Sequence, residues 1–479
     1  MEWFTAPGYG LARLVFQKGL AALYLVAFLC AARQFRALVG ARGMLPVPAF
    51  TARVPFRRAP SLFHAYYSDG FFAGVAWTGC AVAAALLAGA DGLLPLWGAM
   101  LLWALPWALY LSVVNTGGVW YGFGWETLLL ETGFLAIWLG NDRVGPPVLV
   151  LFLLRWLLFR LEFGAGLIKI RGDECWRRLT CLEHHHETQP MPGPLSWFFH
   201  RLPRPLHRVE AAANHVTQLA VPFLLFTPQP VASLAAAVMI VTQLWLVLSG
   251  NFSWLNHLTV VIALSALDFT PYTRAHRASG AAPLWYEVLV IAVTAVLVVL
   301  SLGPVRNLLS RRQLMNSSFE PLRLVNTYGA FGTVSRMRFE VVVEGTADER
   351  PRADGDWRAY EFRGKPGDPR RWPRQFAPYH LRLDWMMWFA ALSPAYARSW
   401  FTPFVERLLE GDRDTLRLLR SSPFPPGSPP RHVRARLFRY RFTTPAELRA
   451  TGACWERTFV RDYLAPTRLE GAPSGAPTP

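Results

Sequence analysis

The sequence predicts a polytopic α-helical membrane bundle of about eight or nine helices, followed by a small α+β soluble C-terminal domain. Hydrophobic residues make up 52% of the 479 residues and charged residues only 17%, a balance typical of a membrane protein. Apolar stretches of near-spanning length recur up to Gly303. Beyond Gly303 the chain is rich in Arg, Asp, Glu and Pro and has no further spanning run.

Helices that cross a bilayer need about 20 mostly apolar residues. The stretches that approach this length are residues 11–32, 71–90, 93–114, 124–140, 147–170, 208–227, 230–249, 251–268 and 284–303. Those at 124–140 and 208–227 carry charges and are the weaker candidates. We therefore expect a transmembrane domain over residues 1–305, interrupted by polar loops at 33–70 and 171–207.

A soluble domain is expected over residues 306–466. Phe339, Val341 and Val343 fall on one face at a period of two, so 338–344 reads as a strand, with 357–362 as its partner. The aromatic-rich 381–392 predicts a short helix, 404–419 predicts one or two amphipathic helices around Gly411, and 433–442 predicts another strand. Residues 467–479 are expected to form a disordered tail, since the chain from Glu470 onward is rich in Pro, Gly, Ser and Ala.

The formal net charge is +17. Flanks of membrane helices account for this charge, and no nucleic-acid-binding module accompanies it, so we expect no nucleic-acid partner. The Arg residues gather in loops 33–70 and 171–207, which lie on one side if five helices precede the second loop. The positive-inside rule makes that side cytoplasmic, and nine helices would place the C-terminal domain there as well.

Ionisable residues inside the apolar stretches are the unusual feature of this sequence. They are Glu126 and Glu131 in stretch 124–140, and Arg155, Arg160, Glu162 and Lys169 in stretch 147–170. Such residues are costly when they face lipid, so they should point into the bundle. Arg155, Glu162 and Lys169 lie seven residues apart and therefore share one helical stripe, and Glu126 or Glu131 could pair with the arginine. We expect either a structural ion-pair network or a polar cavity.

Cysteine and histidine patterns are less informative. Cys175 and Cys181 could pair if their loop lies in an oxidising compartment. The run from His184 to Glu187 invites a metal interpretation, but consecutive loop residues rarely converge on one ion. We therefore predict a polar interfacial loop there, with no metal and no cofactor. The sequence has no Walker-type loop, GxSxG or HExxH signature, so no catalytic residue is predicted.

Several segments together resemble the lipase maturation factor family. They read SVVNTGGVWYGFGWE at 112–126, GAGLIKIRGD at 164–173, VNTYGAFG at 325–332, KPGDP at 365–369 and PYHLRLDW at 378–385. The resemblance extends in order over nearly the whole chain. It implies a multi-pass membrane protein that helps secreted lipases fold and assemble, without a reaction of its own. The expected partners are a client protein such as a lipase and membrane lipid.

The same resemblance implies a location and a site. Eukaryotic relatives lie in the endoplasmic reticulum membrane with a non-cytoplasmic C-terminal domain, and a bacterial member would lie in the cell inner membrane. This sidedness conflicts with the charge pattern. The candidate partner-binding residues are Tyr328, Asp384, Trp385 and Trp388, although the tryptophans at helical spacing are more often core.

Two other functions are compatible with the sequence. Residues 165–170 and Trp176 also resemble, over a short stretch, the vitamin K-dependent carboxylase-like membrane family. In that alternative the chain is a membrane enzyme and Lys169 acts as a base, because a desolvated lysine can have a lowered pKa. Transport of a lipid or small solute is also compatible with the buried charges, although no internal repeat supports it.

Overall fold

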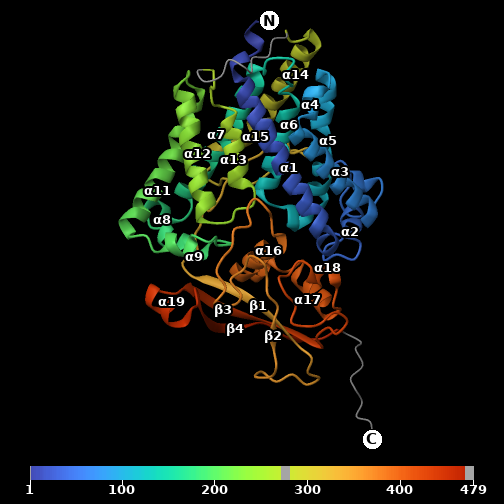
Figure 1. Ribbon diagram of the computed structural model, residues 1–479, viewed down its shortest axis with the longest axis vertical. Helices are drawn as coiled ribbons and strands as arrows, with labels where there is room; N and C mark the ends of the chain where they lie inside the picture. The colour runs from blue at the N-terminus through green and yellow to red at the C-terminus, as the bar shows by residue number, and fades with distance from the viewer. Residues whose placement is uncertain (1, 271–280, 470–479) are drawn as a thin grey trace.

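A computed structural model describes residues 2–270 and 281–469, and its N-terminal part is a bundle of helices (Figure 1). The longer helices are α1 (Gly10–Leu38), α3 (Asp69–Ala88), α5 (Leu96–Thr116), α6 (Gly124–Ile137), α7 (Val148–Arg171), α11 (Arg204–Leu219), α12 (Val231–Ser249), α13 (Leu255–Leu264) and α14 (Leu284–Leu300). Each of the predicted apolar stretches thus contains a helix.

Within residues 2–270 and 281–469, five helical segments are long and apolar enough to cross a membrane: Pro7–Leu38, Asp69–Ala88, Leu96–Thr116, Val231–Ser249 and Leu284–Leu309. The last of these combines α14 with α15 (Leu302–Leu309). The other stretches fall short for physical reasons. Helix α6 has 14 residues and α13 has 10, which at about 1.5 Å per residue is less than a bilayer core. Helix α7 is long enough but carries the four charged residues noted above.

The stretch at 208–227 is not one helix. Helix α11 ends at Leu219, and a 3-10 segment follows at Val221–Phe226 (η5), with Pro222 near its start. Proline lacks an amide hydrogen and cannot continue an α-helix ladder. Helix α11 is also strongly amphipathic rather than uniformly apolar. The prediction of a spanning helix here is therefore wrong in form, because two shorter elements replace it.

The helices approach one another closely where glycine removes the side chain. A Cβ atom on Gly79 of α3 would lie 2.3 Å from Phe28 of α1, and one on Gly133 of α6 would lie 1.8 Å from the hydroxyl of Tyr24. Small residues at crossing points are how membrane helices gain packing contacts without a hydrophobic driving force between them. Helix α1 is thereby held between α3 and α6.

Shorter elements fill the loops at the end of the bundle away from the N-terminus (Figure 1). They are α2 (Val47–Thr51) in the first polar loop and α8 (Glu174–Arg177), α9 (Leu182–Thr188) and α10 (Ser196–His200) in the second. A further short helix, α4 (Ala90–Leu93), joins α3 to α5. The predicted interfacial loop at 184–187 is wrong, because these residues belong to α9 and both His185 and His186 are buried.

The C-terminal part contains a four-stranded antiparallel sheet with the order β2-β1-β3-β4. The strands are β1 (Arg338–Thr346), β2 (Arg358–Ala359), β3 (His432–Phe442) and β4 (Trp455–Thr467), and the helices are α16 (Arg382–Leu392), α17 (Phe401–Leu409), α18 (Arg413–Leu416) and α19 (Pro445–Thr451). The strands predicted at 338–344 and 433–442 and the helix at 381–392 are confirmed. Two helices separated at Gly411 are confirmed as well, whereas β2 is much shorter than predicted.

Strand β4 and helix α19 were not predicted. Strand β4 is an edge strand that is mostly exposed, and its pairing with β3 contains register shifts. Both features remove the simple period-two alternation by which a strand is recognised. Strand β4 extends to Thr467, the first residue of the predicted disordered tail, and residues 470–479 of that tail lie outside the described residues.

The C-terminal domain docks on the end of the bundle opposite the N-terminus, with α16 between the sheet and the helices (Figure 1). Gln34, in the last turns of α1, donates to the carbonyl oxygen of His380 at 2.7 Å and accepts from the backbone N–H of Arg382 at 3.2 Å. One side chain of the first membrane helix therefore hydrogen-bonds the segment that leads into α16.

Candidate functional site

The buried carboxylate of Glu131 joins the helical bundle to the segment between the bundle and β1, which contains Asn326 and Tyr328. Arg160 of α7 forms an ion pair with Glu131 and donates to the carbonyl oxygen of Asn326 at 2.6 Å. Glu131 also accepts from the backbone and side-chain N–H groups of Asn326, each at 3.0 Å, and from the hydroxyl of Tyr328 at 2.7 Å. A charge in the bundle core is thus neutralised and fully hydrogen-bonded, as burial requires.

Glu126, one and a half turns earlier on α6, binds the C-terminal domain instead. Arg382 of α16 donates to Glu126 at 2.6 Å and to the carbonyl oxygen of Trp120 at 2.6 Å. The guanidinium lies 3.6 Å from the ring centroid of Tyr121, a favourable cation–π distance. The hydroxyl of Tyr110 donates to Glu126, and Nδ1 of His380 lies 3.4 Å from the carboxylate.

The remaining charges of α7 lie in separate surroundings. Glu162 accepts from Gln218 at 3.2 Å and from Gln243 at 2.7 Å. The Lys169 ammonium donates to Asn214 at 2.8 Å and to Gln218 at 2.9 Å, and it lies over the Trp176 ring. Gln218 therefore bridges the two charged groups. These contacts favour a structural Lys169 over a catalytic base.

Arg155 does not join either acidic residue of α6. Its guanidinium donates to the hydroxyl of Tyr9 at 2.8 Å and to the carbonyl oxygen of Leu225 at 3.3 Å. The predicted pairing of a glutamate with this arginine is therefore wrong, because Arg160 takes that place. The stripe predicted from the seven-residue spacing is divided, since neighbouring elements change along the length of α7: Glu162 and Lys169 share Gln218, whereas Arg155 has partners of its own.

The four residues singled out for partner binding lie inside the protein or half inside it. Tyr328, Asp384 and Trp385 are buried, and the indole of Trp388 donates to the carbonyl oxygen of Thr188 at 3.0 Å. Asp384 accepts from the backbone N–H of Gly364 at 2.6 Å. These contacts hold α16 against the rest of the protein, and partner binding by these side chains stays a prediction.

The structure adds residues to which the sequence assigned no role in the buried charge network, above all His380, Asn326 and Gln218, and it shows that Arg382 pairs with Glu126 rather than with the nearby Asp384. Each lies far along the chain from the charge that it contacts. In the sequence, these polar residues stand out only because their neighbours are apolar or aromatic, as Arg382 does between Leu381 and Leu383. A cation flanked by apolar residues in a short helix is a weak signal, because long cationic side chains often reach the surface.

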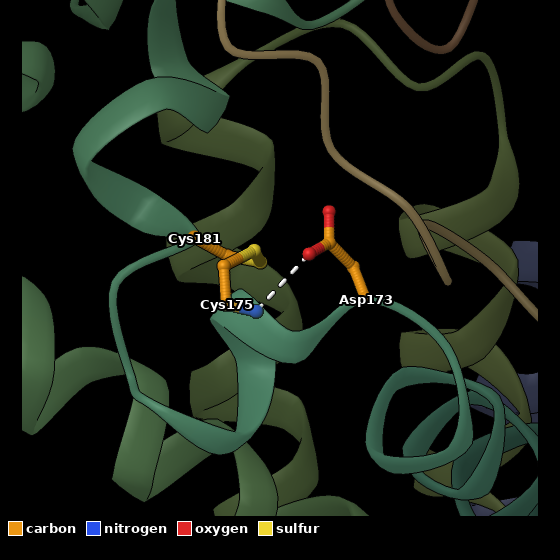
Figure 2. A group of neighbouring side chains, drawn as sticks. All are labelled: Asp173, Cys175 and Cys181. Atoms are coloured by element: carbon orange, nitrogen blue, oxygen red, sulfur yellow. Dashed lines mark hydrogen bonds between the residues drawn. A yellow bond between two sulfur atoms is a disulfide. The ribbon is translucent and has the colours of Figure 1, made fainter.

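The second polar loop carries a disulfide between Cys175 and Cys181 (Figure 2). Asp173 begins α8 by accepting from the backbone N–H of Cys175 at 3.0 Å, an N-cap arrangement. The same carboxylate accepts from Arg336 at 2.8 and 3.0 Å. Although Asp173 and the two sulfurs are close enough to suggest a metal site, the disulfide leaves no thiolate ligand.

This loop holds the chain just before β1. The backbone N–H of Asp173 donates to the carbonyl oxygen of Gly332 at 2.9 Å. The indole N–H of Trp176 donates to the carbonyl oxygen of Phe331 at 2.8 Å. With Glu131 and Glu126, the loop forms a series of contacts that fixes residues 326–336 and α16 to the bundle. The arrangement positions one domain on the other.

Asp384 leads to a pH-dependent prediction. Burial raises the pKa of its carboxyl group from 3.8 to about 6. The folded state then holds the proton of Asp384 more tightly than the unfolded chain does. Protonation of Asp384 therefore stabilises the folded protein fully below pH 3.8, and this stabilisation is lost as the pH rises through about 6. One pKa unit is worth about 1.4 kcal/mol, so Asp384→Asn should raise the free energy of unfolding near neutral pH by roughly 2–3 kcal/mol. Denaturant unfolding of detergent-solubilised protein across this pH range measures the effect.

Asp414→Asn is the matched control for this experiment. Asp414 and Asp384 line the same cavity of about 360 Å³ between α1 and the C-terminal domain, but Asp414 is partly exposed and pairs with Arg417 at 3.1 Å. This variant should change the free energy of unfolding by no more than about 1 kcal/mol, the usual contribution of a solvent-exposed ion pair. A pH slope that persists unchanged in the Asp384→Asn protein would contradict the prediction.

Comparison with known proteins agrees with this architecture. Residues 11–273 match the profile described as the lipase maturation factor transmembrane domain, and residues 324–465 match the lipase maturation factor C-terminal domain. The chain is 39% identical to lipase maturation factor 1 of Mus musculus, over 96% of this chain and 88% of that protein. The identity is 38% with lipase maturation factor 1 of Homo sapiens, over 96% and 88%, and 29% with lipase maturation factor 2 of Homo sapiens, over 96% and 83%. No solved structure matches the chain.

Proposed function

This chain belongs to the lipase maturation factor family, and from that premise we propose that it is a membrane-embedded, chaperone-like factor that assists the folding, maturation or assembly of secreted lipase-like enzymes. The observation that carries the proposal is similarity over 96% of the chain to proteins named for lipase maturation. The similarity includes both the helical bundle and the C-terminal domain. The client is a lipase, and the surrounding lipid contacts exposed apolar side chains of α12 and α14 such as Val241 and Val299.

The C-terminal domain faces a non-cytoplasmic, oxidising compartment in this proposal. The disulfide of the second polar loop supports that side, because disulfides persist in the endoplasmic reticulum lumen and the periplasm and are rare in the cytosol. The loop and the C-terminal domain lie at the same end of the bundle (Figure 1), and Asp173 of the loop pairs with Arg336. Positive charge is a weaker guide, since long domains cross a membrane largely regardless of it. The membrane is that of the endoplasmic reticulum in a eukaryote and the inner membrane in a bacterium.

The buried residues act on the client indirectly. Tyr328, Asp384, Trp385 and Trp388 keep α16 and the segment before β1 in place, and this placement sets the surface that a lipase meets. In the same way, the pairs of Glu126 and Glu131 contribute no chemistry to the client and serve to hold the two domains in one arrangement.

Coexpression with a secreted lipase tests the function. The full chain should raise the specific activity of the secreted lipase several-fold over an empty-vector control, and crosslinking from membranes should recover the lipase. Cys175→Ser should lower this gain, because opening the small disulfide loop costs about 2 kcal/mol and loosens the contacts to residues 331–336. Lipase activity per lipase molecule and the amount of chain in the membrane are measured together.

Cys80→Ser is the matched control, since Cys80 is a buried free cysteine on α3 and lies outside the loop. It should retain the full gain. Equal lipase activity with and without the parent chain would refute the proposed function. A Cys175→Ser protein that is as active as the Cys80→Ser protein would refute only the role of the disulfide loop.

A further inference from the structure

Two buried histidines and a glutamate converge where the second polar loop meets the bundle. His186 lies on α9, and His207 and Glu210 lie on the first turns of α11. Nε2 of His186 is 3.6 Å and Nδ1 of His207 is 3.8 Å from the same carboxylate oxygen, Oε2 of Glu210. One ligand atom from each of the three side chains lies within 4.8 Å of the others.

The ring nitrogens of this cluster make no hydrogen bond within the part of the chain that the structure describes. The residues are 1% and 2% exposed for His186 and His207. Both ring nitrogens of each histidine, and Oε2 of Glu210, are buried without a hydrogen-bond partner among the described residues. Buried polar atoms normally have partners, and orphaned ones call for an explanation such as an unseen ion.

The surroundings hold the ligand atoms in a fixed orientation. Oε1 of Glu210 accepts from the indole N–H of Trp245 on α12 at 2.7 Å, which leaves Oε2 turned toward the histidines. The ring of Phe199 lies 5.3 Å from that of His186 and 4.9 Å from that of Trp245. The hydrogen bond from Trp245 to Oε1 of Glu210 is of the kind by which proteins orient a carboxylate that binds a metal through its other oxygen.

We propose that His186, His207 and Glu210 form a binding site for a divalent transition-metal ion, with zinc the best match. Two imidazoles and one carboxylate are a known zinc ligand set, and a water completes the tetrahedron. Zinc–nitrogen and zinc–oxygen bonds of about 2.0–2.2 Å place ligand atoms a little over 3 Å apart. The ligand atoms here lie within 4.8 Å of one another, so the side chains need to close by up to about 1.5 Å. His207 and Glu210 at i and i+3 share one helix face, and α9 supplies the third ligand.

A simple ion pair between protonated histidine and glutamate explains the cluster less well. At 3.6 and 3.8 Å the nitrogens are too far from the carboxylate for hydrogen bonds. An ion pair would leave one nitrogen of each ring facing the carboxylate without a hydrogen bond, whereas a metal would bond directly to one nitrogen of each ring. Consecutive histidines such as His184–His186 rarely converge on one ion, whereas the three ligands of this cluster come from two helices.

The site goes beyond the proposed chaperone function and has a structural consequence. Helix α9 also contacts the C-terminal domain, since Glu187 accepts from the backbone N–H of Phe442 at 2.8 Å and Thr188 accepts from Trp388. A metal that joins α9 to α11 would therefore tie this contact to the bundle. The disulfide restrains the start of the same loop, and the metal restrains its end.

Metal analysis of the full chain tests the proposal. The protein is purified in detergent with a tag that contains no histidine, stripped with a chelator, dialysed against zinc and measured by mass spectrometry. The parent chain should hold about one zinc per chain, as a single four-coordinate site predicts. Glu210→Gln, which keeps an acceptor for Trp245, and His207→Asn should bind at least tenfold more weakly. Zinc should raise the unfolding temperature of the parent chain but not that of the Glu210→Gln and His207→Asn proteins.

His184→Asn is the matched control, because His184 lies on α9 but outside the cluster, and it should bind as the parent does. Cobalt titration of the parent chain needs no variant: a saturable visible spectrum of a low-coordinate ion is expected. The proposal is overturned if the parent holds no more zinc than Glu210→Gln, if His184→Asn loses the metal equally, or if cobalt gives only the weak spectrum of the hydrated ion.

Discussion

Glu131→Gln is expected to lower the free energy of unfolding by about 3–5 kcal/mol, because removing one partner of a buried ion pair leaves the other charge uncompensated. The glutamine can still accept from Asn326 and Tyr328. The decrease in the free energy of unfolding therefore reports mainly the cost of leaving the charge of Arg160 without its counterion. That guanidinium would remain in the bundle core with only neutral acceptors such as the carbonyl oxygen of Asn326. Denaturant unfolding in detergent, followed by tryptophan fluorescence, measures the change.

A double-mutant cycle separates the ion pair from packing. Arg160→Met alone should be similarly harmful, since it leaves the glutamate unpaired, and combining it with Glu131→Gln should recover most of the loss. Glu174→Gln is the control, because Glu174 pairs with Arg178 at 2.7 Å on the surface, where such pairs contribute about 0–1 kcal/mol. If Glu131→Gln is no more harmful than Glu174→Gln, the buried pair does not hold the bundle together.

Arg382→Met should detach the C-terminal domain from the bundle. The methionine preserves much of the side-chain volume but removes the donors to Glu126 and Trp120 and the cation over Tyr121. The carboxylate of Glu126 is then left buried without its strongest partner, again at a cost of about 3–5 kcal/mol. We expect faster hydrogen exchange and proteolysis in residues 378–392, with the exchange of α3 and α12 unchanged.

Neutralising the other partner provides the internal check. Adding Glu126→Gln to Arg382→Met removes the unpaired charge and should slow the exchange of α16 again. Arg398→Met is the control for the loss of a surface arginine, since Arg398 is exposed. Hydrogen exchange of α16 in this variant should equal that of the parent protein. Unchanged protection of α16 in the Arg382→Met protein would show that docking rests on other contacts, such as those of Gln34.

Elements whose residues repeat with a regular period were predictable. The apolar helices α1, α3, α5, α12 and α14 follow from runs of hydrophobic residues, and β1 and β3 follow from apolar residues at every second position of the sequence, although β1 is buried on both faces. The exposed edge strand β4 and the break between α11 and η5 were missed. Strand β4 is exposed to solvent and has register shifts in its pairing, and a proline breaks the helix after α11. None of these features produces a regular repeat of hydrophobic residues in the sequence.

By itself, the sequence determined that this is a membrane protein of the lipase maturation factor family, and that charges such as Glu131 and Lys169 must find partners inside it. Hydropathy and motif order are local properties, and they suffice for these conclusions. Only the tertiary structure decided the partners: Arg160 rather than Arg155 for Glu131, Arg382 for Glu126, and His207 beside His186. Those residues come together because helices and loops distant in the chain pack side by side, and no local pattern encodes which distant charge will lie within hydrogen-bonding distance.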